Sequence, residues 1–275
     1  MYVTINDASY WYEVTGQGPP VVLLHGFTGS SATWNTVVDT WYKEFRFIRI
    51  DLPGHGKTRT QTPRTMQTCC DDLMQLLTYL EFDKVHLLGY SMGGRTGLSF
   101  AMMYPEMVAS LILESASPGL ETENERRARM AHDENLAQKI EQEGISAFVN
   151  FWEDIPLFQT QRKLPPKKRR EIRDERLSQS APGLVQSLRY MGTGKQPSWW
   201  DQVRELSVPV LLVAGALDEK FVKLNQRLKN RLQSGDLIIV EDVGHAIHVE
   251  QPTFFGKIVT EFILKVCSKG GSGVG

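Results

Sequence analysis

The pentapeptide Gly-Tyr-Ser-Met-Gly at 89–93 constrains this chain more than any other feature of its sequence. It follows the apolar run at 85–88 and precedes a plausible helix over 94–103, so Ser91 stands at a strand-to-helix turn. So sharp a turn leaves no room for side chains beside the serine, and it strains the backbone of the serine itself. A glycine-flanked serine between strand and helix is typical of a nucleophile elbow, although a Gly/Ser turn can also arise by chance.

Two further residues strengthen this interpretation. Asp218 lies just past an apolar strand at 208–215, and His245 follows another at 237–240. A serine hydroxyl is a poor nucleophile or base without an imidazole to take its proton, and the imidazole needs a carboxylate to hold its tautomer. The order Ser, Asp, His along the chain is that of the α/β-hydrolase fold. We therefore predict a catalytic triad of Ser91, Asp218 and His245.

Rival residues lie close to two of these positions. Glu219 and Asp242 are alternative acids, and His248 is an alternative base. The preceding Gly244 and the position just past a strand favour His245 over His248.

The overall composition limits the classes of partner. The chain has 275 residues, 31 lysines and arginines against 32 aspartates and glutamates, and a net charge of −1, which argues against a nucleic-acid partner. No apolar run is long enough to span a membrane, and the first residues lack the pattern of a signal peptide. Three cysteines (69, 70 and 267) make a poor disulfide framework. We expect a cytoplasmic monomer or weak homo-oligomer that acts on a small molecule and needs neither metal nor cofactor.

Alternation of strands and helices indicates the architecture. Residues 2–15 have the pattern of a hairpin, and short apolar strands follow at 21–24, 45–50 and 108–113. Strands that alternate with helical stretches predict a mostly parallel, doubly wound sheet with the site at the carboxyl ends of its strands.

Polar helical patterns interrupt this alternation. They predict helices at 121–137, 145–152, 167–179 and 184–191. We expect residues 120–200 to form a helical cap over the site, inserted into a core of residues 1–119 and 201–269, with a flexible glycine-rich tail at 270–275.

The segment at 25–29, His-Gly-Phe-Thr-Gly, follows the first buried strand. In the α/β-hydrolase geometry one oxyanion donor comes from the residue after the nucleophile and another from this loop, which predicts the backbone amides of Met92 and Phe27. His25 is expected to be structural or to line the pocket.

The distribution of arginines points to an anionic substrate. Arg95 lies one helical turn beyond Ser91, on roughly the same face. The predicted cap has three arginines at 126–129, and eight basic residues against three acidic ones over 162–176. Most of these belong to solvated helix faces, but a few could bind carboxylates bidentately.

Several segments together resemble a known enzyme family. Tyr-Ser-Met-Gly-Gly-Arg at 90–95, Glu-Ser-Ala-Ser-Pro-Gly-Leu at 114–120 and Glu-Arg-Arg-Ala-Arg at 125–129 are similar to the 2-succinyl-6-hydroxy-2,4-cyclohexadiene-1-carboxylate synthases of menaquinone (vitamin K2) biosynthesis. The segments at 51–56 and 148–158 add to this resemblance.

The resemblance implies a lyase that eliminates pyruvate from 2-succinyl-5-enolpyruvyl-6-hydroxy-3-cyclohexene-1-carboxylate. Ser91, activated by His245 and Asp218, would act as the base that removes a ring proton. The residues that would surround the substrate are Tyr90, Arg95, Arg129, Trp152 and Arg176. The alternatives are a serine hydrolase (an esterase or a carbon–carbon bond hydrolase) and a non-catalytic binding module, and the complete triad argues against the last.

Overall fold

The structure is a computed structural model that describes residues 1–270, which contain one nine-stranded sheet. The strands are β1 (Tyr2–Ile5), β2 (Ala8–Thr15), β3 (Pro20–Leu24), β4 (Arg46–Ile50), β5 (Arg59–Thr60), β6 (Val85–Tyr90), β7 (Val108–Glu114), β8 (Val210–Gly215) and β9 (Gly235–Val240). Their order across the sheet is β1-β2-β4-β3-β6-β7-β8-β9, and β5 pairs with β2.

Strands β4, β3, β6, β7, β8 and β9 are parallel, as the alternation of strands and helices predicts. Strand β2 is antiparallel to each of its neighbours, β1, β4 and β5. Side chains along a strand point alternately to the two faces, so Val21 and Leu23 join one apolar cluster while Val22 and Leu24 join the other. A parallel sheet covered on both faces needs such continuous apolar strands, and every residue of β6 and β8 is buried.

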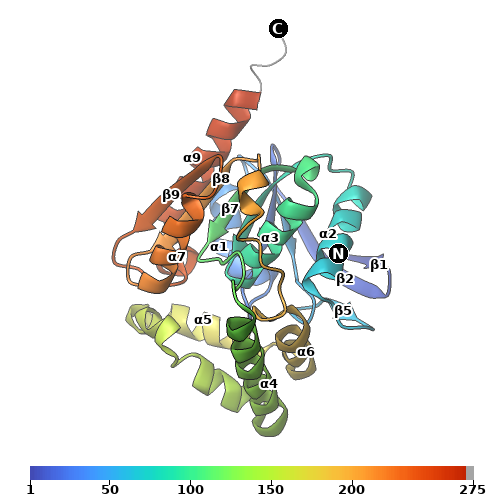
Figure 1. The fold of residues 1–275 in the computed structure, drawn as a ribbon, viewed down its shortest axis with the longest axis vertical. Helices are drawn as coiled ribbons and strands as arrows, with labels where there is room; N and C mark the ends of the chain where they lie inside the picture. Colours follow the sequence, from blue (N-terminus) through green and yellow to red (C-terminus); the bar gives the residue numbers. More distant parts are fainter. Residues whose placement is uncertain (271–275) are drawn as a thin grey trace.

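Helices cover both faces of the sheet (Figure 1). They are α1 (Asn35–Trp41), α2 (Met66–Tyr79), α3 (Met92–Met103), α7 (Glu219–Lys229), the short α8 (Ile247–Glu250) and α9 (Pro252–Gly270). Within residues 1–270, no helix combines the length and the apolar character that crossing a membrane requires.

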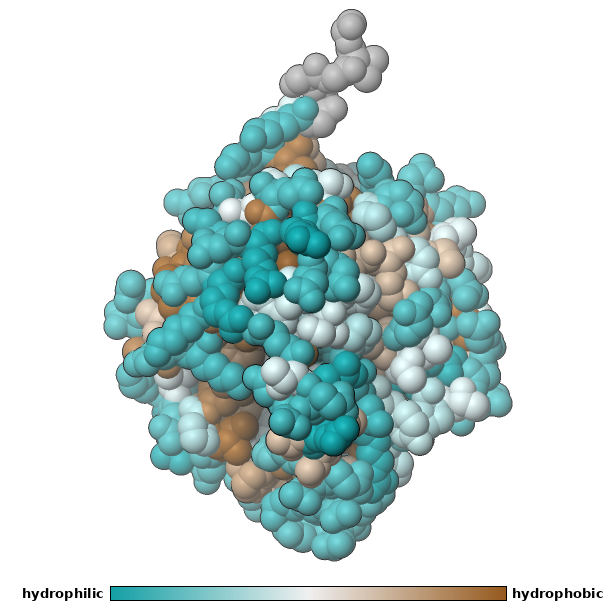
Figure 2. All heavy atoms as spheres, in the orientation of Figure 1, coloured by the Kyte–Doolittle hydropathy of each residue, from teal (hydrophilic) through white to brown (hydrophobic). Residues whose placement is uncertain are grey.

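The cap helices α4 (Glu123–Trp152), α5 (Pro166–Leu177) and α6 (Ala181–Met191) lie between β7 and β8 in the chain and gather at one end of the molecule (Figure 1). They share an apolar cluster of their own, which includes Ile140, Phe148 and Leu184. Figure 2 shows apolar surface exposed where these helices meet the rest of the molecule, on a face that is otherwise mostly hydrophilic.

The structure departs from the sequence prediction in several elements. Helices α1, α7 and α9 were not predicted, and α4 runs on past residue 137 because Ile140 is buried against the cap cluster. Only Gly144, at a φ of 80°, breaks α4. Gly270, predicted to begin a flexible tail, is instead the last residue of α9, and the rest of that predicted tail lies outside the described residues.

Candidate active site

Ser91 occupies the turn between β6 and α3 with a φ of 49° and a ψ of −105°, a conformation that L-residues rarely adopt. Its amide donates a hydrogen bond to the Glu114 carbonyl oxygen at 2.9 Å, which fixes the turn against the end of β7. Gly93 passes so close to β3 that a Cβ atom there would collide with the carbonyl oxygen of Leu24. The glycine is therefore required by close packing of α3 on the sheet, as the motif predicts.

His245 connects the serine to an acid. Its Nε2 lies 3.1 Å from Ser91 Oγ, and its Nδ1 lies 2.7 Å from Asp218 Oδ2. With Nδ1–H donating to the carboxylate, Nε2 is free to accept the serine proton. The side chains of His245 and Asp218 are only 2% and 8% exposed, so the pair is screened from water. The three residues predicted as a triad are thus brought together in hydrogen-bond contact.

The two alternative acids, Glu219 and Asp242, lie at the surface of the molecule. The side chain of Glu219 is 82% exposed and pairs with Lys223, and Asp242 is also exposed. His25 is buried beneath the site, where its Nε2 accepts the amide proton of Leu52 at 3.0 Å.

His248 belongs to a buried pair that sequence reasoning missed. The carboxylate of Glu114, at the end of β7, accepts hydrogen bonds from the backbone amide of His248 at 3.0 Å and from its Nδ1 at 2.8 Å. The Tyr90 ring lies between two imidazoles, with centroids 4.6 Å from His248 and 5.4 Å from His245. Glu114 therefore braces both the serine turn and the segment that follows His245. The sequence feature that could have indicated this pair is a glutamate at the end of a mostly apolar strand.

A cavity of about 340 Å³ opens beside the serine. The predicted site residues that line it, besides Ser91 and His245, are Phe27, Tyr90, Met92, Arg95, Arg129 and Trp152. Its walls come from the loop after β3, from the serine turn and α3, and from helices α4, α6 and α7.

The backbone amides predicted as oxyanion donors are those of Met92 and Phe27, and both residues line the cavity beside Ser91. Met92 is the first residue of α3, so its amide is one of the four that an α-helix leaves without an internal partner. The positive end of the helix dipole adds to the attraction for negative charge there. Phe27 lies in the loop after β3 and lines the same cavity.

Arg95 is a buried cation with neutral partners. Its Nη1 donates at 3.0 Å to the carbonyl oxygen of Met191 and at 3.0 Å to Oε1 of Gln196. Burial, together with the nearby charge of Arg129, lowers the pKa of Arg95 to about 10. Arg129 differs, because it is partly exposed and forms an ion pair with Asp133 at 2.7 Å. Arg95 thus forms no ion pair within residues 1–270, although the Asp133 carboxylate, which pairs with Arg129, lies near enough to raise the pKa of Arg95.

Trp152 forms the aromatic side of the cavity. It stacks on Phe148 with ring centroids 5.5 Å apart, and the ring of Phe27 meets it edge-on at 5.5 Å. Its indole N–H is buried without a hydrogen-bond partner among the described residues.

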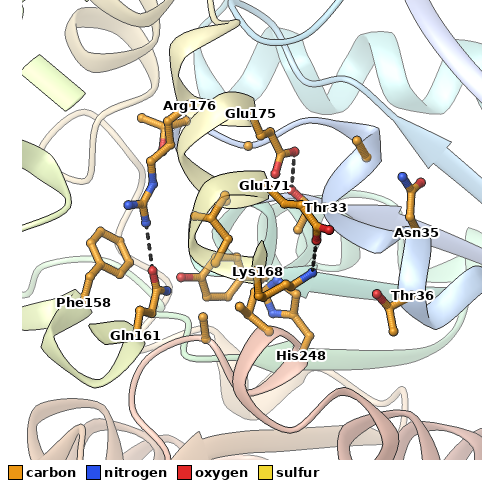
Figure 3. Close-up of a pocket in the computed structure, with 18 of the residues that line it drawn as sticks. Thr33, Asn35, Thr36, Phe158, Gln161, Lys168, Glu171, Glu175, Arg176 and His248 are labelled. Atoms are coloured by element: carbon orange, nitrogen blue, oxygen red, sulfur yellow. Dashed lines mark hydrogen bonds and ion pairs between the residues drawn. The ribbon is translucent and has the colours of Figure 1, made fainter. Parts of the chain in front are cut away.

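Arg176 lies in a neighbouring cavity of about 400 Å³ (Figure 3). Its Nη2 donates to Gln161 at 3.2 Å, and its guanidinium lies over the Phe158 ring at 4.6 Å. Burial lowers the pKa of Arg176 as well. The rings of Phe27, Tyr90 and Phe158 line both cavities and separate Arg176 from Ser91. Of the residues predicted to contact substrate, Arg176 alone does not line the serine cavity.

Comparison with known proteins agrees with this geometry. Residues 19–252 match the alpha/beta hydrolase fold family. A Bacillus subtilis (strain 168) protein that provisionally carries the name 2-succinyl-6-hydroxy-2,4-cyclohexadiene-1-carboxylate synthase is 46% identical over 96% of this chain and 98% of its own length. The solved structure of MenH from S. aureus is 34% identical, with a TM-score of 0.90 over 93% of this chain and 98% of its own.

A thermophilic esterase from Thermogutta terrifontis has the same fold, with 26% identity and a TM-score of 0.86 over 97% of this chain and 99% of its own. The predicted fold and the resemblance found in the sequence are both confirmed. The chain belongs to the 2-succinyl-6-hydroxy-2,4-cyclohexadiene-1-carboxylate synthase family of the alpha/beta hydrolase fold.

Proposed function

We propose that this protein is a carbon–oxygen lyase that eliminates pyruvate from 2-succinyl-5-enolpyruvyl-6-hydroxy-3-cyclohexene-1-carboxylate in menaquinone biosynthesis. The observation that carries the proposal is a hydrogen-bonded triad beside a buried arginine that has no carboxylate partner within residues 1–270. A buried cation without an ion pair is costly, since Asp133 offsets the charge of Arg95 only from a distance and is itself paired with Arg129. A polycarboxylate substrate would supply further negative charge.

The chemistry requires a base and an oxyanion site. His245 would take the proton of Ser91, and the serine oxygen would remove the ring proton next to the succinyl carbonyl. The electrons of that C–H bond shift the ring double bond and break the bond to the enolpyruvyl oxygen. The enolpyruvate leaves and takes up a proton to become pyruvate, and the ring, which had one double bond, now has two conjugated ones. No acyl-enzyme forms.

Charge develops on the succinyl carbonyl oxygen during proton removal. The amides of Phe27 and Met92 would stabilise this oxyanion, and Asp218 would stabilise the imidazolium form of His245. Tyr90, Arg95, Arg129 and Trp152 would hold the substrate. For Arg176 the proposal requires a substrate carboxylate to extend past Phe158, or Phe158 to change rotamer.

The molecular organisation that we propose has a core of residues 1–119 and 201–269 and a cap of residues 120–200. The cap would bring cations to a substrate whose reacting carbon faces the core. A cytoplasmic location and a monomeric or weakly associated state remain predictions, as does the absence of a cofactor.

Release of pyruvate from the proposed substrate tests this function. We expect a severe loss of activity for Ser91→Ala. For Arg95→Ala we expect a loss of at least about tenfold, because a hydrogen bond to a charged group contributes roughly 1.5–3 kcal/mol. Arg170→Ala, which removes an exposed cap arginine, serves as the control and should remain close to wild type. Rapid cleavage of simple esters without pyruvate release would instead establish the alternative, a serine hydrolase with the same triad.

A further inference from the structure

Glu175 links cap helix α5 to the loop that carries Phe27. One carboxylate oxygen, Oε1, accepts three hydrogen bonds, from the Ser30 amide at 2.9 Å, the Ser30 hydroxyl at 2.7 Å and the Thr33 hydroxyl at 2.8 Å. Figure 3 shows Glu175 and Thr33 facing each other across the wall of the second cavity. The two sides of this contact are more than 140 positions apart in the chain. It therefore joins the cap to the core rather than stabilising α5 alone.

The loop that receives these bonds has a strained backbone. Thr28 is buried with a φ of 67°, in the left-handed region that a β-branched residue rarely enters. Such a conformation persists only where the surrounding structure holds it. The bonds to Glu175 begin two residues after Thr28 and are charge-assisted, which makes them stronger than neutral ones.

The other end of the loop is also held by the cap. The side chain of Phe27 packs against Trp152 at 5.5 Å and Phe148 at 6.3 Å between ring centroids, both on α4. Thr28 thus lies between an aromatic contact with α4 and a polar contact with α5. The core holds the loop as well, because the Ser31 amide donates to Oδ1 of Asp51 at 2.6 Å and the Phe27 ring meets His55 at 5.5 Å between centroids. The bond nearest to Thr28 is a local turn, in which the Gly29 amide donates to the Gly26 carbonyl at 3.1 Å.

We propose that Glu175 is a positioning residue, which acts together with Asp51 of the core to hold the loop at 26–33 in its strained form, so that the Phe27 amide faces the reacting oxygen when the cap helices are docked. This inference rests on the proposed use of the Phe27 amide as an oxyanion donor. Binding of substrate beneath the cap would then complete the catalytic arrangement as it orders the cap. The contribution of Glu175 falls on the transition state, in which the oxyanion forms, rather than on ground-state binding.

Steady-state pyruvate release by Glu175→Ala, Glu175→Gln and Glu171→Ala tests the inference. Loss of one oxyanion donor lowers kcat by about 10²–10³, so a displaced donor in Glu175→Ala should lower kcat by at least about tenfold, with KM within about threefold of wild type. The kcat of Glu175→Gln should lie between those of wild type and Glu175→Ala, because the amide oxygen can still accept hydrogen bonds through its two lone pairs but lacks the charge. Glu171 is the matched control, since it lies one turn earlier, lines the same cavity and pairs with Lys168 of its own helix at 3.6 Å.

Amide hydrogen exchange of residues 26–33 provides a second measurement that needs no substrate. Exchange should be faster in Glu175→Ala than in wild type and unchanged in Glu171→Ala. Unchanged exchange together with unchanged kcat in Glu175→Ala would overturn the inference, as would equal effects of the two alanine variants. If wild type released no pyruvate, the proposed function would fail while the exchange experiment still decided whether Glu175 holds the loop.

Discussion

At the scale of single residues, Asp218 serves two partners with its two carboxylate oxygens. Oδ2 accepts from His245 at 2.7 Å, and Oδ1 accepts from the amide of Phe221 at 3.4 Å, where it caps the start of α7. The helix cap fixes the carboxylate so that it in turn fixes the imidazole. This double use explains how a residue on the loop after β8 can orient the imidazole of His245.

Replacing Asp218 by asparagine keeps the shape of the side chain and removes its charge. We expect kcat to fall by about 10³–10⁴, because the amide favours the wrong tautomer of His245 and leaves the imidazolium without a counter-charge. Glu219→Gln neutralises the adjacent, exposed acid and should change kcat less than about twofold. Steady-state pyruvate release measures both, and similar losses in the two variants would contradict the assignment of the acid.

At the scale of elements, the contact between α3 and β3 depends on glycine at one position and tolerates alanine at another. A Cβ at Gly93 would collide with the backbone of Leu24 and His25, which belongs to or adjoins a fixed strand. A Cβ at Gly97, one turn along, would meet only the side chains of Leu24 and Leu111, at 3.8 and 3.5 Å.

We therefore expect opposite effects of alanine at these two glycines. Gly93→Ala should destabilise the protein by several kcal/mol, in the range of severe steric substitutions. Gly97→Ala should be neutral or stabilising by up to about 1 kcal/mol, because alanine has the higher helix propensity. Urea unfolding gives both values, and comparable losses would show that the close approach of α3 is not specific to Gly93.

Local sequence patterns predicted much of this structure. Continuous apolar runs predicted the buried strands, and the glycines around Ser91 predicted the turn, because close packing requires apolar or small residues at those positions. Polar contacts between residues far apart in the chain have no such pattern in the sequence. The bonds from Glu114 to His248 and from Glu175 to Thr33 join residues more than 130 positions apart, and no spacing rule connects them. The same limit applies to Arg176, whose place in the second cavity depends on how α5 packs.

At the scale of the whole molecule, several histidines are buried in neutral form. Desolvation lowers the pKa of His55 to about 3 and of His86 to about 4, and it lowers the pKa of His25 as well. In the unfolded chain these rings regain a pKa near their usual value of about 6.5. Between pH 7 and 4 the unfolded state therefore binds more protons than the folded state, and the free energy of unfolding falls as the pH falls.

His86 alone should account for about 2 kcal/mol of that loss between pH 7 and 5. In His86→Gln the decrease in unfolding free energy over this range should be smaller by that amount. His132→Gln, which changes an exposed histidine of α4, should leave the pH dependence as in wild type. Urea unfolding at the two pH values measures the difference, and identical slopes for His86→Gln and wild type would contradict a buried neutral His86.

The cap helices come from one uninterrupted stretch of chain between β7 and β8, and this has an evolutionary consequence. Mutations in that stretch can alter the substrate that a lineage accepts while the parallel strands keep their register and the serine keeps its partners. The freedom has a boundary at Ser30 and Thr33. If Glu175 holds the loop as we propose, a replacement for α5 would need an acceptor that faces these two donors.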